Sequence, residues 1–289
     1  MVIEVKLLSV DGYTIIDVPG SAFTVGPIRS AKKVLRRTSI DLARHATYVC
    51  AVQRFDAVGA VAAVNFDRAS EDPNPFTAFS DELATWAKAT NFVGCAALGL
   101  SAEEAGPALH SSVAKNVEMA ALSAAACTPP NAQTFAVVSD GEEPALKAIL
   151  GERQLDVHPD LATGLASGVD VLFVRGKTGV LDHAVLKDAN VKVIIALQPL
   201  TTTARGLAVA GRAGVTIMPD FVSASGPVLA ALGLTPDEIV TQTRAAIGRA
   251  VIERETNFGI DMFVKMSEMA EDHLRTGTEQ LPFGRPLAP

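Results

Sequence analysis

The side chains that could perform chemistry in this chain do not add up to a metal centre. Five histidines are present, and none pairs with a second histidine and an acidic residue at metal-binding spacing: His45, His110, His158, His183 and His273. His45 and Cys50 could meet on adjacent turns of a helix, but packing in a core explains both residues better. We therefore expect no metal site.

Two short motifs point toward phosphate binding or acyl transfer, and both fall short. Gly176-Lys177-Thr178 resembles the end of a P-loop, but Val171 stands where the first glycine belongs. No Gly-x-Ser-x-Gly elbow exists, so a hydrolase has no support. Ser223 and Ser225 beside Gly226 could hydrogen-bond a ligand, although serine more commonly forms turns at such positions.

The bulk composition excludes several classes of protein. The 289 residues carry a net charge of −7, which gives no electrostatic footprint for nucleic acid, and the basic cluster at residues 29–37 is typical of a solvated face. No apolar run is long enough to span a bilayer, and the N-terminus lacks the blocks of a signal peptide. Three widely spaced cysteines indicate reduced thiols and a cytoplasmic protein: Cys50, Cys95 and Cys127.

The elements that must position these residues change character near residue 130. Residues 1–18 alternate like two strands around an Asp11-Gly12 turn. A helix at about 40–53 and a strand at 60–64 follow, and Ser80 is expected to cap a further helix. An alanine-rich helix at 112–126 then ends before Thr128-Pro129-Pro130.

Beyond those prolines, short apolar strands alternate with helices, which is typical of a parallel sheet covered by helices. Strands are expected at 134–138, 169–174, 191–197 and 215–218, and helices at 142–150, 180–187 and 204–212. Thr235-Pro236-Asp237-Glu238 is a capping box that begins a helix to about residue 255, and another helix follows from Asp261. The proline-rich tail at 282–289 is expected to be loosely ordered.

Four segments in order resemble one enzyme family. They are LARHATYVCA with RFDAVGAVAAV (42–51 and 54–64), LSAEEAG (100–106), GVTIMPDFV with Gly226 (214–222), and MAEDHL (269–274). The chain is similar in these segments to the leucine branch of the glutamate/leucine/phenylalanine/valine dehydrogenases. The resemblance implies an α/β protein with a substrate-type domain (1–110), a trimmed Rossmann-like parallel-sheet domain (111–260), and a C-terminal helix and tail returning to the first domain (261–289).

The resemblance also shows which catalytic groups this chain lacks. The family uses one lysine to hold the substrate carboxylate, a second catalytic lysine, and a carboxylate that shuttles protons. Both lysine positions fall on valine here, at Val49 and Val61, and the carboxylate position falls on Glu104. An anion entering such a pocket loses solvation at a cost of about 2–7 kcal/mol. The valines either shape a pocket for a new ligand or simply close the old one, and Glu104 without lysine partners fits a solvated loop residue.

The nucleotide-binding turn departs from the family pattern as well. It should follow the first strand of the second domain, where this chain has Ser139-Asp140-Gly141-Glu142-Glu143. Only Gly141 remains of the glycine pattern, and the three acidic residues would repel a phosphate. The chain then runs from Leu150 almost directly to the strand at 169, so about one strand–helix unit is expected to be deleted, with Asp156 in a loop.

These features predict a dehydrogenase homologue without NAD-dependent oxidative deamination, a pseudoenzyme or repurposed protein that needs no cofactor. Two alternatives stay open: an enzyme of different chemistry acting on a small molecule in the same interdomain cleft, and an atypical NAD(P)-dependent oxidoreductase. Glu104 is the catalytic candidate, and the candidates for the cleft are Gly26, Arg29, Val49, Asp56, Val61, Ser223 and Ser225. Self-association or association with a related subunit is expected through the N-terminal strands, with no nucleic-acid or membrane partner.

Overall fold

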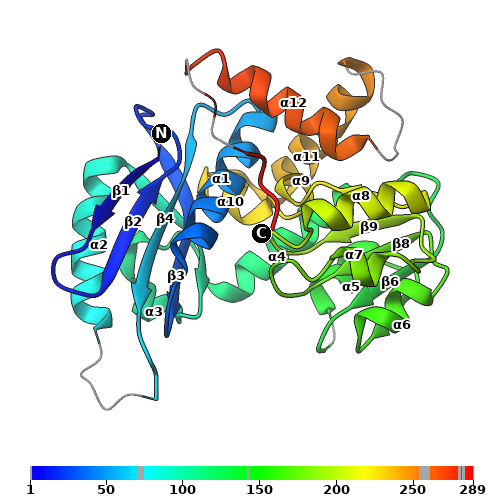
Figure 1. Ribbon diagram of the computed structural model, residues 1–289, viewed down its shortest axis with the longest axis horizontal. Coiled ribbons are helices and arrows are strands. Elements are labelled where there is room, and N and C mark those ends of the chain that lie inside the picture. Colours follow the sequence, from blue (N-terminus) through cyan, green and yellow to red (C-terminus); the bar gives the residue numbers. More distant parts are fainter. Residues whose placement is uncertain are drawn as a thin grey trace.

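The computed structural model describes residues 2–69, 75–141, 143–253, 261–278, 281 and 284–288. Within these residues the strands form two five-stranded sheets that lie side by side, each with its own covering helices (Figure 1). The helix α4 (Val113–Ala126) leads from one sheet to the other, and α12 (Met262–Leu274) returns to pack on the first. The expected two-domain α/β fold is confirmed.

The first sheet is mixed, with the strand order β1-β2-β4-β3-β5. Its strands are β1 (Ile3–Lys6), β2 (Gly12–Ile16), β3 (Thr24–Ala31), β4 (Val58–Asn65) and β5 (Phe92–Leu98). Only β3 with β4 and β3 with β5 run parallel. Alternate residues of β4 face opposite sides: Val61 and Ala63 join a cluster with α1 (Arg36–Val52), whereas Ala60 and Ala62 join one with α2 (Phe76–Thr90).

Three of these elements differ from the sequence-based expectation: β3 and β5 were not predicted, and α2 begins earlier than expected. The strand β3, which lies between β4 and β5, was not predicted because Gly26-Pro27 interrupts its pattern, and the structure has a bulge against β5 between these two residues. Ser80 was predicted to cap a helix, which is wrong. The helix α2 begins four residues earlier, because Phe76 and Phe79 belong to the apolar face that packs on the sheet.

The second sheet is entirely parallel, with the order β10-β9-β8-β6-β7. Its strands are β6 (Phe135–Val138), β7 (Leu155–His158), β8 (Val171–Val174), β9 (Val193–Ala196) and β10 (Thr216–Met218). The expected deletion directly after residue 150 is therefore wrong, since β7 and α6 (Leu161–Ala166) form a strand–helix unit there, and Asp156 lies in the strand. The signal was weak because β7 is a short edge strand whose central residues are exposed.

The second sheet is nevertheless smaller than a six-stranded dinucleotide fold. In that fold the third strand lies beyond the second, on the same side of the first. Here the chain crosses back after β7 and places β8 on the other side of β6. The outer third strand is thus absent from the described part of the chain, which agrees with a trimmed Rossmann-like sheet.

Helices cover the second sheet and bridge the two domains. They include α5 (Pro144–Leu150), α7 (His183–Leu186), α8 (Ala204–Ala213), α9 (Asp220–Ser223), α10 (Gly226–Ala231) and α11 (Pro236–Glu253). The capping box at Thr235 is confirmed, since its hydroxyl and backbone both bond the Glu238 carboxylate. The expected end of α11 near residue 255 lies outside the described residues. No helix in the described ranges is long and apolar enough to cross a membrane.

Candidate functional site

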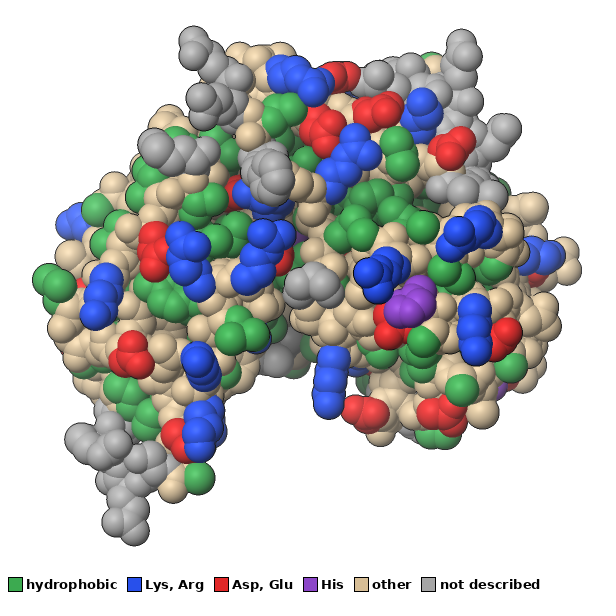
Figure 2. Space-filling model, viewed as in Figure 1, with side chains coloured by type: hydrophobic (Ala, Val, Ile, Leu, Met, Phe, Trp, Pro, Cys, Tyr) green, Lys and Arg blue, Asp and Glu red, His purple; other side chains and the backbone are tan. Residues whose placement is uncertain are grey.

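A cavity of about 460 Å³ lies between the two domains. It is lined by the last residues of β3 and β5 and Gly99 after β5, by Leu42 of α1, and by the loops that follow β8 and β9: Arg29, Ser30, Leu42, Leu98, Gly99, Gly176, Lys177, Thr178, Gln198 and Pro199. These positions are the carboxyl ends of parallel strands, where α/β proteins bind ligands. Figure 2 shows the surface hollowed between the two lobes, with Lys and Arg side chains on both sides of the hollow.

The cavity carries positive charge that the protein does not neutralise. Arg29, at the end of β3, is half-buried, and Lys177, in the loop after β8, is exposed. Neither side chain has an ion-pair or hydrogen-bond partner among the described residues, and no lining residue is acidic. Of the predicted cleft residues, Arg29 alone lines this cavity.

The two valines lie in closed apolar surroundings, and the Val61 cluster includes Leu42 of the cavity wall. Val61 is fully buried in a cluster that includes Ile15 and Leu42 of the first domain, Leu200 of the second, and Ala288 near the C-terminus. Val49 is equally buried, in a cluster that also contains Cys95, Met119 and Phe221. Neither valine lines one of the cavities described here, so both act as walls that hold the domains together.

The C-terminal segment crosses the seam between the domains. Arg285 forms a two-pronged ion pair with Glu271 of α12, at 2.7 and 3.2 Å, and Tyr48 of α1 donates a hydrogen bond to the same carboxylate. Three residues later, the Ala288 amide donates to the Thr202 carbonyl of the second domain at 2.9 Å. Residues 284–288 are thus docked on both domains, contrary to the expectation of a loose tail (Figure 1).

The turn after β6 is filled by a carboxylate of the protein itself. Glu143 is buried and forms a two-pronged ion pair with Arg175, which follows β8, and it accepts a hydrogen bond from the Ser139 hydroxyl at 2.8 Å. Burial raises the pKa of Glu143, but the bonds from Arg175 and Ser139 outweigh it, so the pKa lies below its usual value. Gly141 and Asp140 are exposed, and Glu142 lies outside the described residues.

This arrangement differs from the phosphate site of a dinucleotide fold. In a dinucleotide fold, the crevice at the ends of the first strand and its neighbours receives the phosphates on backbone N–H groups. Here the crevice between β6 and β8 holds the Glu143 carboxylate and its Arg175 partner. A phosphate placed there would meet a buried negative charge whose cation is already paired.

A buried acid–imidazole pair lies on the domain seam. The His45 Nε2 atom of α1 and the Asp220 Oδ1 atom of α9 are 3.7 Å apart, and neither atom has a hydrogen-bond partner in the described structure. Burial lowers the pKa of His45 to about 4 and raises the pKa of Asp220 to about 7. The other oxygen of Asp220 accepts from the Thr201 amide, which fixes the turn that contains Leu200 at a φ of 56°. That turn follows two residues of the cavity wall, Gln198 and Pro199.

Glu104 has a structural role. Its carboxylate bonds the Ser101 amide in a capping box at the start of α3 (Ala102–Ala105), and it binds both terminal nitrogens of Arg68 at 3.0 and 2.8 Å. The bond from Arg68 lowers the pKa of this carboxyl, so Glu104 stays ionised and engaged. The catalytic role considered from the sequence gains no support from this geometry.

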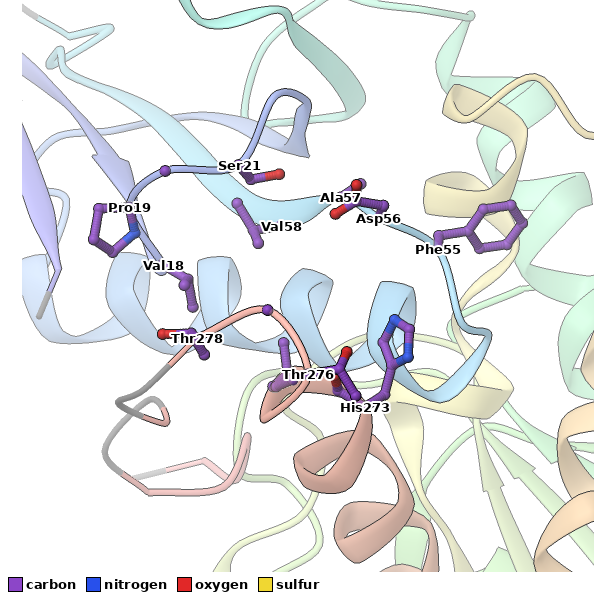
Figure 3. Close-up of a pocket in the computed structure, with 13 residues that line it drawn as sticks. Val18, Pro19, Ser21, Phe55, Asp56, Ala57, Val58, His273, Thr276 and Thr278 are labelled. Atoms are coloured by element: carbon purple, nitrogen blue, oxygen red, sulfur yellow. The ribbon is translucent and has the colours of Figure 1, made fainter.

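Asp56 lies away from the interdomain cavity, in a different pocket. That pocket, of about 370 Å³, is formed where β4 begins and α12 ends, at the opposite end of the first sheet from the cavity. In Figure 3, Asp56 lies on one wall and His273, Thr276 and Thr278 on the other. The expectation that Asp56 belongs to the cleft is therefore wrong.

The remaining candidates are packed inside the protein. Gly26 lies in β3 against β4, and a Cβ there would come 1.7 Å from the Ala60 carbonyl oxygen, so the glycine permits sheet packing. Ser223 donates to the Ala196 carbonyl and Ser225 to the Val222 carbonyl, each at 2.7 Å, and both serines are fully buried. None of the three is available to a ligand in the cavity.

Metal chemistry gains no support from the described part of the chain, where no three His, Cys, Asp or Glu side chains gather in a geometry suited to a metal ion. The three cysteines are free and buried, and burial raises the pKa of each thiol. The sequence did not single out Arg175 or Asp220 as site residues, and Lys177 was considered only as the end of a P-loop. A charged residue directly after a buried parallel strand was the signal that could have found Arg175.

The fold is that of amino-acid dehydrogenases. The structure is similar to L-tryptophan dehydrogenase from Nostoc punctiforme, with 12% identity and a TM-score of 0.66 over 96% of this chain and 95% of that one. It is similar to hetero-hexameric glutamate dehydrogenase from Thermus thermophilus in its leucine-bound form, with 14% identity and a TM-score of 0.68 over 97% and 90%. A further glutamate dehydrogenase gives 13% identity and a TM-score of 0.71 over 96% and 86%.

No protein-family model and no curated protein sequence matches the chain. The structural likeness therefore establishes the fold, and activity has to be argued from the site.

Proposed function

We propose that this chain is a leucine-dehydrogenase-like protein that does not carry out NAD-dependent oxidative deamination, a pseudoenzyme or a repurposed scaffold. The observation that carries the proposal is the state of the two family lysine positions. Val49 and Val61 are fully buried in apolar clusters. Oxidative deamination needs an ammonium group to hold the substrate carboxylate and another to stabilise developing charge, and valine supplies neither.

The turn after β6 supports the same proposal independently. The Glu143–Arg175 pair and the Ser139 hydroxyl satisfy each other at the place where a dinucleotide fold binds phosphate. NAD binding there would require the ion pair to separate, which leaves a buried charge without its partner. The buried valines thus argue against catalysis, and the Glu143–Arg175 pair argues against NAD binding, in two different parts of the chain.

An enzyme of different chemistry is the second candidate, because the interdomain cavity stays open while the lysine positions are closed. Its catalytic groups would not be those considered from the sequence, since Glu104 is held by Arg68 and the two serines are buried. An atypical NAD(P)-dependent oxidoreductase is the weakest alternative, because the Glu143–Arg175 pair occupies the place where the dinucleotide phosphates would bind.

The test is a calorimetric titration with NAD, NADH, NADP and NADPH, combined with deamination and reductive amination assays across the twenty amino acids and their 2-oxo acids. An active glutamate dehydrogenase serves as the matched positive control. We expect no saturable binding and no turnover. Saturable NAD-dependent deamination of any amino acid would overturn the proposal, and tight NAD(P) binding without it would favour the oxidoreductase alternative.

We also propose that the chain self-associates through β1. This strand is the edge of the first sheet, and Ile3, Val5 and Leu8 in and beside it are exposed. A similar glutamate dehydrogenase is described as hetero-hexameric, which supports assembly of this fold and leaves a related subunit as another partner. Light scattering should give a mass above that of the 30.2 kDa chain, and Val5→Lys should reduce it. A monomer at all concentrations would contradict self-association.

The buried free thiols support the expected cytoplasmic location.

A further inference from the structure

We propose that the pocket of about 370 Å³ beside Asp56 binds a small organic amine, whose ammonium group is held by the Asp56 carboxylate. This pocket lies where β4 begins and α12 ends, at the opposite end of the first sheet from the interdomain cavity, and the two spaces share no lining residue. Binding there goes beyond the proposed function and does not depend on it.

The pocket carries a negative charge that the protein leaves free. Asp56 is exposed, and its carboxylate has neither an ion-pair nor a hydrogen-bond partner among the described residues. No lysine or arginine is among the described residues that line the pocket. An ammonium group that enters would therefore meet an unpaired carboxylate and no lysine or arginine that competes for it.

The turn that ends α1 fixes where Asp56 lies. The Arg54 amide donates to the Ala51 carbonyl at 3.0 Å. The Phe55 amide donates to the Cys50 carbonyl at 2.9 Å, which completes a Schellman turn. Arg54 takes the left-handed position of this turn at a φ of 64°, where glycine is usual. The chain then passes directly into β4, so Asp56 lies on the pocket wall between the two elements (Figure 3).

The opposite wall is the carboxyl end of α12, which also attracts a cation. This helix has 13 residues, and its last residue, Leu274, lines the pocket together with residues 276–278. The carboxyl end of a helix carries a partial negative charge, which stabilises a nearby positive group. In Figure 3 the His273 ring points from the end of α12 toward the wall with Asp56, and a neutral imidazole has a nitrogen that accepts a hydrogen bond. Both walls therefore favour an ammonium group between them.

The remaining lining residues set the size and polarity of the ligand. Val18, Val58 and Leu274 are almost fully buried and provide apolar walls, whereas Ser21 and Thr276 contribute hydroxyl groups. The volume of about 370 Å³ lies within the usual range of small-molecule sites, about 300–1,000 Å³. The pocket therefore suits a primary amine with a short aliphatic body.

The test compares two probes that differ in charge and share a body: 3-methylbutylamine and its neutral counterpart, 3-methylbutan-1-ol. In a ligand-observed NMR titration of the full chain at neutral pH, the amine should bind about fivefold more tightly than the alcohol or better. A charge-assisted bond to a carboxylate gives this preference, and solvent screening of the exposed Asp56 limits it. Ammonium chloride, which has the charge without the body, should bind at least about fivefold more weakly than the amine.

Variants then assign the binding to this pocket. Asp56→Asn keeps the size of the side chain and removes its charge, so the amine should lose about fivefold in affinity while the alcohol is unchanged. Asp188→Asn removes the same charge from an exposed position after α7 in the second domain and should leave both affinities unchanged. Thr276→Phe adds a ring at the exposed end of α12, where it narrows the pocket, and should weaken the amine and the alcohol alike.

Several results would overturn the inference: equal affinity for the amine and the alcohol, equal affinity for the amine and ammonium chloride, or no binding of the amine at millimolar concentration. Binding elsewhere in the protein would survive both Asp56→Asn and Thr276→Phe, and that outcome would also overturn it. These readouts need neither turnover nor NAD, so their outcome is separate from that of the test of the proposed function.

Discussion

Arg175 and Lys177 are two residues apart in one loop, yet they meet opposite surroundings. Arg175 turns toward β6 and forms a closed ion pair with the buried Glu143 carboxylate. Lys177 faces the first domain across the cavity, without a partner in the described structure. The first crevice is filled by a carboxylate of the protein itself, whereas the second has no acidic lining residue among those described. The difference shows that, at the carboxyl ends of one parallel sheet, an ion pair can fill one crevice while the neighbouring cavity stays accessible.

The largest expected effect comes from placing a third cation in the closed wall of the seam. Val61→Lys buries an ammonium among Ile15, Leu200 and Ala288, and burial of that kind lowers a lysine pKa by about 3–5 units, equivalent to about 4–7 kcal/mol of stability. Urea unfolding measures the loss, and the variant should gain no deamination activity. Val157→Lys, on the exposed face of β7, should change stability by less than about 0.5 kcal/mol. A stable Val61→Lys chain with deamination activity would contradict the conclusion that Val61 lies in a closed apolar cluster.

Breaking the closed ion pair should have the next largest effect. Arg175→Ala leaves the Glu143 carboxylate buried without its cation, which should cost about 3–5 kcal/mol in urea unfolding. Replacing both partners, as Glu143→Leu with Arg175→Met, should cost less than Arg175→Ala alone, because no buried charge remains. If Arg175→Ala costs less than about 1 kcal/mol, the two crevices do not differ in the way we describe.

Removing the C-terminal segment tests what closes the seam beside the cavity. Deletion of residues 284–289 removes the Arg285–Glu271 ion pair and the Ala288 side chain from its place against Val61 and Leu200. We expect a loss of about 2–3 kcal/mol in unfolding free energy. Arg285→Ala, which keeps Ala288 in the chain, should cost about 1 kcal/mol and so separates the two contributions. An unchanged stability would show that the docked tail contributes nothing to closure.

The smallest effect concerns Asp220, which holds the turn beside the cavity. Its pKa of about 7 exceeds the unfolded value of 3.8, so the folded state holds a proton that the unfolded state releases, and stability falls as pH rises from about 4 to 7. Asp220→Asn removes this dependence. Relative to wild type, the variant should gain about 2 kcal/mol between about pH 5 and pH 8.

The neighbouring His45 has the opposite slope, but it is present in both proteins of this comparison. Its pKa is lowered from 6.5 to about 4, so its contribution to stability is lost as pH falls through that range. Asp188→Asn, at a highly exposed carboxyl, serves as the control and should show no such pH dependence. A difference between Asp220→Asn and wild type that does not vary with pH would show that Asp220 does not titrate in this window.

The prediction of the fold from the sequence succeeded where burial is uniform. The strands β6, β8 and β9 are four-residue runs of apolar side chains, and their pattern stands out. It failed at β3, where Gly26-Pro27 breaks the pattern, at the partly exposed edge strand β5, and at β7, where an exposed edge carries Asp156. In each case the strand exists because its neighbours supply hydrogen bonds, and single-chain periodicity does not contain that information.

The candidate site was less predictable than the fold. Of the seven cleft candidates, only Arg29 lines the interdomain cavity, because side chains reach it from four strand ends that are far apart in the sequence. Asp56 precedes β4 and so lies at the other end of the sheet, and Ser223 and Ser225 point into the core. Motif spacing alone does not indicate which end of a strand a residue occupies.

The sequence by itself determined that valine occupies positions 49 and 61 and that the turn after β6 is acidic. Those residue types exclude an ammonium group and disfavour a phosphate wherever they lie. Only the tertiary structure decided that Glu143 pairs with Arg175, that Ala288 packs in one cluster with Val61, and that Arg29 and Lys177 line one cavity without an acidic neighbour among its described lining residues. The physical reason is that charge pairing and burial depend on distances between residues far apart in the chain, and these distances are set only when the two domains pack.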